Sequence, residues 1–263
     1  MVRELREALD DHQFEVLYQP QVHLETSTIT GYEALLRWRH PLRGVIEPQD
    51  FMRSAELSGL IIPIGLQTLD LICAHISHWD DQLNIAVNFS PRQLSTDNAA
   101  REIIDTLDRS GTPHNKVIVE VTELGVVGQN AAATLATLHK EGIRIALDDF
   151  GAGFASFAAL SELPLDILKI DQSLTWALSD TQHSSERAFI VMETIAAIAV
   201  KLGMESIAEG VETAEQAAAV TRAGCTTGQG YYFGKPLPAD AHTTAIQEPP
   251  LAVASPAQHR RWR

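Results

Sequence analysis

Cysteine is scarce in this sequence. Cys73 and Cys225 are the only two cysteines among 263 residues, and they lie far apart along the chain. A framework of disulfide bonds needs several cysteines, so the sequence argues against one. Proteins without disulfides are typical of reducing compartments, and we therefore expect a cytoplasmic protein.

Basic residues are also few. Lysine and arginine number 20 against 34 aspartates and glutamates, which gives a formal net charge of -14. So acidic a protein has no general attraction for DNA, RNA or anionic lipid. An anionic ligand must therefore meet a local arginine, a local lysine or a metal ion.

Long apolar runs are missing as well. The best candidate, residues 188–203 (AFIVMETIAAIAVKLG), is interrupted by Glu193 and Lys201, whereas a membrane-spanning helix needs about 18 or more apolar residues. The first residues, MVRELREALDDHQ, form a charged amphipathic segment and do not have the pattern of a signal peptide. We expect no membrane span.

The sequence does contain a regular alternation of strand-like and helix-like segments. Several of the strand-like runs are almost continuously apolar, as in strands that are covered on both faces. The runs are residues 14–20, 28–38, 84–90, 116–123, 144–149, 166–171, 205–212 and 228–234. With helical patterns between most of them, this order predicts an α/β fold, a single (β/α)8 barrel of the TIM type. We assign residues 1–246 to the barrel and predict that the Pro-containing residues 247–263 form a disordered tail.

Local signals predict the direction of one strand and several helix ends. The connection between residues 20 and 28 is too short for a crossover helix, so the first strand is expected to run antiparallel to the second. Residues 90–93 (SPRQ) and 213–216 (TAEQ) have the pattern of a capping box at a helix start. Gly142 and Gly203 are predicted to end the helices at 131–141 and 185–202.

Polar residues recur where the predicted strands end. In a barrel of this type the active site lies at the carboxyl ends of the strands. So many carboxylates at one level would repel each other without a countercharge. The set has oxygen ligands and no cysteine or histidine, which favours Mg²⁺ or Mn²⁺ over zinc, and two such ions would suit an in-line attack on a phosphodiester. The residues are Glu33, Arg37, Asn88, Glu120, Glu123, Asp148, Asp149, Lys169, Asp171, Glu209, Glu212 and Gln229.

Asp148 and Asp149 are adjacent, and successive side chains of a strand point to opposite faces. Both carboxylates can reach one site only if the strand ends there and the backbone turns. Gly151 and Gly153, which follow directly in the sequence IALDDFGAGF, would permit such a turn.

Two basic residues complement the carboxylates. Period-two spacing places Leu35 and Arg37 on the same strand face as Glu33, so we expect both in the substrate site, with the Arg37 guanidinium on a phosphate. Lys169 is a point charge that could hold a nucleophilic water or a phosphate oxygen.

Structural alternatives exist for each residue alone. A single carboxylate at a strand end can be a helix cap, Lys169 can be a surface lysine, and Arg37 can form a structural ion pair. The prediction rests on the coincidence across six strands. The ten histidines show no metal-ligand spacing, and residues 231–233 (YYF) are interpreted as packing where the barrel closes.

The sequence resembles the EAL-domain phosphodiesterases that hydrolyse cyclic di-GMP. The resemblance runs from about residue 14 to 238 and rests on nine motifs in order. They are YQP, GYEALLRWRHP, FMRSAELSGLI, NFSPRQL, VEVTE, ALDDFGAG, LKID, IAEGVET and GQGYYFGKPLP. It implies a barrel whose first strand is antiparallel, a cyclic di-GMP substrate and the linear product pGpG. It also allows a homodimer.

The resemblance further implies a role for each site residue. Glu33, Asn88, Glu120 and Asp148 would bind one Mg²⁺ or Mn²⁺ ion, and Asp149 would help to bind a second. The catalytic residues would be Glu33, Lys169, which holds the attacking water, and Glu209, which acts as its base or as a partner of the second ion. Glu123 would steady the loop after Asp149. Arg37 would bind a substrate phosphate, with Glu212 and Gln229 beside the guanine and the metal shell. Ca²⁺ should inhibit, because its looser coordination shell fits such a site badly.

Two positions depart from the family pattern, and two other functions stay open. Ala152 stands where threonine is usual, and Thr226 stands where aspartate is common, which bears on loop order and on rate. A catalytically silent receptor for cyclic di-GMP would bind the nucleotide without releasing pGpG. A barrel lyase or isomerase with Lys169 as its base would cleave no phosphodiester.

Overall fold

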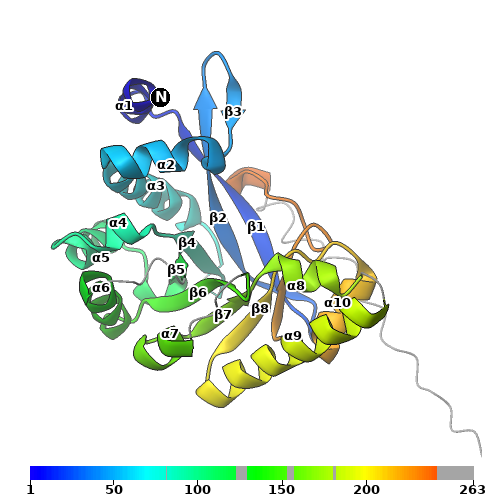
Figure 1. The fold of residues 1–263 in the computed structure, drawn as a ribbon. Helices are drawn as coiled ribbons and strands as arrows, with labels where there is room; N and C mark the ends of the chain where they lie inside the picture. Colours follow the sequence, from blue (N-terminus) through cyan, green and yellow to red (C-terminus); the bar gives the residue numbers. More distant parts are fainter. Residues whose placement is uncertain (81, 123–128, 153–156, 180–181, 242–263) are drawn as a thin grey trace, which may run out of the picture.

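Eight strands close into a barrel in the computed structural model. It describes residues 1–241 apart from residues 81, 123–128, 153–156 and 180–181. The sheet runs in the order β1-β9-β8-β7-β6-β5-β4-β2, closed by pairing of β1 with β2, and β3 extends β2 as a hairpin (Figure 1). The strands are β1 Phe14–His23, β2 Thr28–His40, β3 Gly44–Ile46, β4 Asn84–Asn88, β5 Val117–Thr122, β6 Arg144–Phe150, β7 Ile167–Ile170, β8 Glu205–Ala208 and β9 Thr227–Gln229.

Strand β1 runs antiparallel to both of its neighbours, β2 and β9. The remaining neighbours around the barrel, from β2 through β4 to β9, pair in parallel. The prediction of a barrel with an antiparallel first strand is therefore confirmed. The short hairpin strand β3 was not predicted, because three residues are too few to show a strand period.

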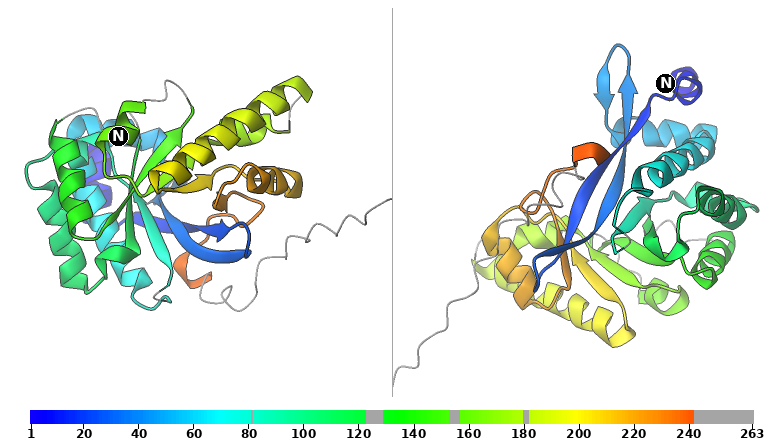
Figure 2. Two further views of the ribbon diagram at one scale, coloured as in Figure 1. Left: turned by 90° about the horizontal axis from the view of Figure 1, so that it is seen from below. Right: turned by 180° about the vertical axis from the view of Figure 1, so that it is seen from behind.

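Helices cover the outside of the barrel, as the two views of Figure 2 show. Both predicted capping boxes are present: Ser90 and Gln93 cap α4, and Thr213 and Gln216 cap α10. Gly142 and Gly203 follow α6 and α9 with positive φ, as C-cap glycines do. The helices are α1 Val2–Asp10, α2 Pro48–Ser58, α3 Ile61–Ile76, α4 Pro91–Leu94, α5 Ala99–Ser110, the 3-10 helix η1 His114–Lys116, α6 Gln129–Lys140, α7 Phe157–Glu162, α8 Gln172–Ala177, α9 Gln182–Leu202 and α10 Ala214–Arg222.

A small apolar layer fills the inside of the barrel. It is separate from the main core between the strands and the helices. Five consecutive parallel strands, β4 to β8, each contribute one of its residues: Ala86, Ile118, Ala146, Ile167 and Ile207. Because side chains alternate along a strand, the residue two positions further on points into the barrel as well.

Two predictions fall outside the described residues. They are the disordered tail at 247–263, with the boundary at residue 246, and the loop role of Glu123. Within the part of the chain that is described, no helix has the length and apolar character needed to cross a bilayer.

Candidate active site

The functional side chains lie directly above the apolar layer inside the barrel. Two residues beyond Ala86, Ile118, Ala146, Ile167 and Ile207 come, strand by strand, Asn88, Glu120, Asp148, Lys169 and Glu209. Because side chains two positions apart point the same way, the apolar layer is followed by a layer of polar groups at the carboxyl ends of the strands.

Lys169 is the centre of this ring. Its Nζ atom lies 2.8 Å from Glu209 Oε1, 2.9 Å from Glu120 Oε2 and 3.0 Å from Asp148 Oδ1. Glu33 Oε2, from β2, lies 3.5 Å away. The Lys169 side chain is 1% exposed, so it is not a surface lysine. One ammonium group therefore faces four carboxyl groups in a water-poor site.

Glu33 is oriented by two amide side chains. Asn88 Nδ2 donates to Glu33 Oε1 at 2.6 Å, and Gln229 Nε2 donates to Glu33 Oε2. Gln229 is itself held by Gln21, whose Nε2 donates to Gln229 Oε1 at 3.0 Å, and by Gln19, whose Oε1 accepts from Gln229 Nε2 at 3.2 Å. The amides leave Glu33 as a fixed carboxylate whose two oxygens are both hydrogen-bonded.

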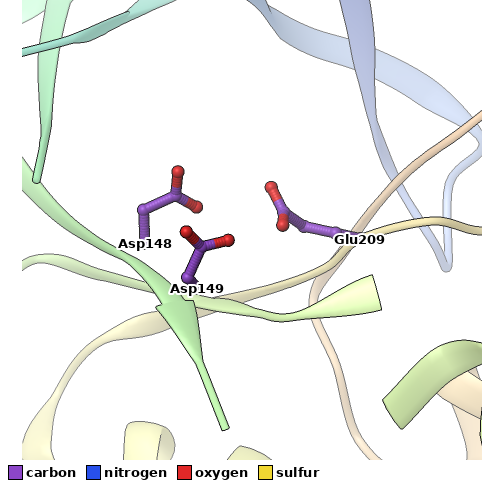
Figure 3. A group of neighbouring side chains, drawn as sticks. All are labelled: Asp148, Asp149 and Glu209. Carbon is purple, nitrogen blue, oxygen red and sulfur yellow. The ribbon is translucent and has the colours of Figure 1, made fainter. Parts of the chain in front are cut away.

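A β-bulge brings Asp149 to the same site as Asp148. The pairing of β6 with β7 shifts register between Leu147 and Phe150, and Asp149 has a φ of 57°. Oxygens of Asp148, Asp149 and Glu209 lie within 4.8 Å of one another, and Figure 3 shows the three carboxylates pointing toward a common space. The predicted turn exists, but it begins at Asp149 itself, two residues before Gly151, which also has a positive φ of 99°; Gly153 lies outside the described residues. Aspartate tolerates this left-handed conformation better than most residues.

The carboxyl groups of the site differ in the direction of their pKa shifts. Burial raises the pKa of Glu33, but Lys169, Gln229 and Asn88 outweigh it, and the pKa lies below its ordinary value. Burial and the nearby Glu33 and Asp148 raise the pKa of Glu120 well above its ordinary value, although Lys169 opposes them. Burial, Asp148 and Glu33 likewise raise the pKa of Glu209 to about 8, again against Lys169. The site therefore holds more carboxyl groups than one lysine can neutralise, and the raised pKa values mean that Glu120 and Glu209 tend to retain a proton.

Lys169 stays a cation in spite of its burial. Burial lowers the pKa of its ammonium group, but Asp148, Glu120, Glu209 and Glu33 raise it well above the ordinary value. A lysine held in this way can donate hydrogen bonds and attract anions, and it cannot act as a neutral base at physiological pH.

The donor set fits a hard divalent cation. The candidate ligands are carboxylate and amide oxygens, which Mg²⁺ and Mn²⁺ prefer. Glu120 Oε1 is buried without a hydrogen-bond partner among the described residues. Burial, with the neighbouring carboxylates, raises its pKa and that of Glu209, and a bound cation would stabilise both groups as carboxylates. The groups that could hold one or two ions are Glu33, Asn88, Glu120, Asp148, Asp149 and Glu209.

A cleft of about 500 Å³ opens above the carboxylates. Four predicted substrate residues, Leu35, Arg37, Glu212 and Gln229, line it together with Glu33, Asp148 and Glu209. Arg37 is largely buried, and its Nε lies 3.0 Å from Glu47 Oε2. The structure thus brings the four predicted substrate residues and the three carboxylates together around one cleft. Asp171 has a different place, because its side chain accepts from Ser173 N at 3.0 Å and caps α8.

Sequence reasoning missed several cleft residues. Gln19 lies within the YQP motif, so a signal for it was present, whereas Gln172 and Trp176 carried none. The interpretation of Tyr231 as packing is wrong: the side chain is 59% exposed and lines the cleft. Tyr232 and Phe233 do pack against the core. Thr226, one of the two departures, exchanges hydrogen bonds with Ser206 in β8 and lies outside the cleft lining.

In the absence of metal ions, the protein is expected to lose stability as pH rises from about 4.5 to about 8, the ordinary and folded pKa values of Glu209. A raised folded pKa means that folding retains a proton, so this contribution is complete below the ordinary pKa and is lost as pH passes the raised one. Tm measured in chelator across this range should fall by several degrees, and Mg²⁺ or Mn²⁺ should remove most of the fall.

Glu209→Gln should make this dependence shallower, because the amide does not titrate, and the remainder is the contribution of Glu120, whose pKa is also raised. Glu205→Gln, at the opposite end of β8 and exposed, is the matched control and should keep it. The lowered pKa of Glu33 acts in the other direction and only below pH 4.5. A metal-free Tm that rises between pH 5 and 8 would contradict the assignment.

The sequence of this chain is similar to those of a known protein family. The family model described as the EAL domain matches residues 2–236. MucR of Pseudomonas aeruginosa, a bifunctional diguanylate cyclase/cyclic di-GMP phosphodiesterase, is 37% identical over 247 residues, which cover 91% of this chain and 35% of that protein. The cyclic di-GMP phosphodiesterase PdeR of Escherichia coli is 34% identical over 242 residues, 90% of this chain and 36% of that protein. The chain spans about a third of the length of the curated relatives it matches.

Solved structures are similar over the whole barrel. The PaMucR phosphodiesterase in complex with c-di-GMP superposes with a TM-score of 0.84 at 34% identity, covering 92% of this chain and 98% of that one. The EAL enzyme Bd1971 in its cAMP- and cyclic-di-GMP-bound form gives a TM-score of 0.85 at 30% identity, covering 94% of this chain and 68% of that one.

Proposed function

Because the chain belongs to the EAL domain family, we propose that it hydrolyses cyclic di-GMP to linear pGpG in a reaction that depends on Mg²⁺ or Mn²⁺. The observation that carries this proposal is the ring of Glu33, Glu120, Asp148 and Glu209 around Lys169, with Asp149 beside it. Relatives at about 35% identity include cyclic di-GMP phosphodiesterases.

The carboxylates would hold two ions. Glu33, Asn88, Glu120 and Asp148 would hold one ion, and Asp149 with Glu209 would help to hold the other. When bound, the ions supply Lewis-acid chemistry that activates water and neutralises charge on the phosphoryl oxygens. Glu33 is prepared for this by its lowered pKa, because a ligand must be deprotonated to bind a cation.

Three other residues bind the substrate phosphate, orient the attacking water and accept its proton. Arg37, held in the cleft wall, donates to a substrate phosphate, and its fixed fork of N–H groups suits two phosphate oxygens. Lys169 Nζ, which can donate three hydrogen bonds, orients the attacking water. Glu209 would accept the proton of that water in its carboxylate form, which its pKa of about 8 makes accessible near neutral pH.

Substrate recognition occurs along the cleft. Its volume of about 500 Å³ lies within the range of sites for small molecules and cofactors. Leu35 supplies an apolar contact beside Arg37, whereas Glu212 and Gln229 offer a carboxylate and an amide to the hydrogen-bonding edge of a base.

The test is a chromatographic assay of cyclic di-GMP incubated with the protein. With Mg²⁺ or Mn²⁺ we expect pGpG to accumulate, and with chelator or Ca²⁺ we expect the reaction to stop, because the looser oxygen shell of Ca²⁺ does not reproduce the geometry of the smaller ions. Nucleotide binding without release of pGpG would instead identify a silent receptor, and absence of both would contradict the proposal.

The structure disfavours a lyase or isomerase that uses Lys169 as its base. Such a base must be neutral when it takes a proton. The four carboxyl groups around Lys169 raise its pKa rather than lower it, so the lysine is suited to binding and not to proton abstraction.

A further inference from the structure

One tryptophan of this chain is exposed inside the cleft. Trp176, in the last turn of α8, is 46% exposed and lines the cleft together with Glu33, Asp148 and Glu209. The other tryptophans that the structure describes, Trp38 and Trp79, are buried. A large apolar side chain contributes most to stability when it is buried, so its exposure at a concave site points to a ligand rather than to packing.

The backbone beside Glu209 fixes the edge of the Trp176 ring. Gly210 has a φ of 66°, and a Cβ atom built on it would lie 3.1 Å from Trp176 Nε1 and 2.4 Å from Gln172 Cβ. Only a glycine allows α8 to approach so closely. The indole is therefore seated against the residue that directly follows Glu209 and does not need to be ordered by the ligand.

The surroundings leave the indole available for stacking. Tyr231, the other exposed aromatic of the cleft, has the Lys235 ammonium 5.3 Å from its ring centre. Among the described residues, no aromatic ring or cation lies against the Trp176 ring in this way. Gln172, one helical turn earlier, lines the same wall and presents an amide. This wall thus combines an aromatic face with a hydrogen-bonding group, as sites for nucleobases do.

The acidic character of the cleft favours a ligand contact that does not depend on charge, such as stacking on Trp176. The carboxylates of Glu33, Asp148, Glu209 and Glu212 line the cleft and outnumber the two cationic groups beside them, Arg37 in the cleft wall and Lys169 among the carboxylates. A ligand with two phosphates is repelled by this surface until cations bind. Stacking on an indole is sequence-tolerant and does not depend on the net charge of the site.

We propose that Trp176 is a binding residue on whose indole one base of the cyclic dinucleotide stacks, at the cleft wall formed by α8 and Gly210. The proposal rests on the proposed function for the identity of the ligand. Trp176 contacts a base and not the scissile phosphate, so it should set KM and leave the chemical step unchanged.

Steady-state kinetics test this division. Trp176→Ala is expected to raise KM for cyclic di-GMP by about 5- to 150-fold, the range for losing one base–aromatic stack, with kcat within about 3-fold of wild type. Trp176→Phe keeps a ring and should recover most of the affinity. Leu57→Ala, which removes an exposed side chain of α2 outside the cleft lining, is the control and should change neither constant.

Fluorescence provides a readout that does not depend on turnover. In a Trp262→Phe background, cyclic di-GMP added with Ca²⁺ should quench the emission of Trp176 in a saturable way, and Trp176→Phe should abolish the quenching, because the remaining Trp38 and Trp79 are buried.

The outcomes separate this inference from the proposed function. Hydrolysis by wild type with an unchanged KM in Trp176→Ala, or a fall in kcat alone, overturns the stacking role and leaves the phosphodiesterase intact. Quenching without hydrolysis supports the stacking role and identifies a receptor. Absence of both quenching and hydrolysis overturns both.

Discussion

Asp148→Ala is expected to abolish measurable hydrolysis of cyclic di-GMP, with kcat lowered by more than about 100-fold, the upper end for losing an outer partner of a metal ligand. Asp148 lies 3.0 Å from Lys169 and within 4.8 Å of the Asp149 and Glu209 oxygens. It therefore borders both proposed ion positions. Turnover is measured as pGpG release at saturating Mn²⁺, and the ion affinity by titration of the same protein.

Glu33→Ala should behave in the same way, because it removes a carboxylate whose pKa is already lowered for metal binding. The control is Glu205→Ala, which removes a strand carboxylate at the opposite end of the barrel, where it pairs with Arg144. This variant should keep turnover within about 3-fold, since an exposed ion pair contributes little. Full activity of either site variant at saturating metal would exclude the proposed metal site.

Lys169→Met is expected to cause the largest loss of stability among single substitutions at the site. Removing the one cation leaves Glu33, Glu120, Asp148 and Glu209 facing each other in a buried space. Removing one partner of a buried ion pair typically costs about 3–5 kcal/mol, which for a chain of this size corresponds to a fall in Tm of roughly 6–20 °C. The measurement is thermal unfolding in chelator at pH 7.5.

Two further results would identify electrostatics as the cause. Mn²⁺ should restore much of the lost Tm, because the ions replace the missing positive charge, whereas hydrolysis should stay low without the lysine. The loss should also shrink as pH falls, because Glu120 and Glu209, whose pKa values are raised by burial, take up protons. Lys201→Met, on the exposed surface of α9, should leave Tm nearly unchanged. An unaltered Tm for Lys169→Met in chelator would contradict the picture of a single buried counterion.

Much of the fold follows from local rules that the sequence displays. The apolar runs and caps predicted the barrel, since strand period and capping depend on neighbours along the chain. The connection of residues 20–28 predicted the antiparallel first strand, because no crossover helix fits there. The strand-end positions of Asn88, Glu120 and Glu209 followed from the same period.

The environment of each site residue did not follow from those rules. Lys169 could have been a surface lysine, and only the closed barrel surrounds it with four carboxyl groups. Asp149 could have pointed away, and a bulge in which it takes a left-handed conformation turns it toward Glu209. Trp176, from α8, and Tyr231, from the segment after β9, are both exposed and line the same cleft.

The positions of the strands along the chain, the direction of the first strand and the polar groups at the carboxyl end of the barrel can be read from the residues in order, because periodicity and turn chemistry act between residues close in the chain. The number of carboxylates around one lysine, and the aromatic ring that stays open to a ligand, depend on the folded barrel. Burial and charge depend on groups that are distant in sequence and meet only when the barrel closes.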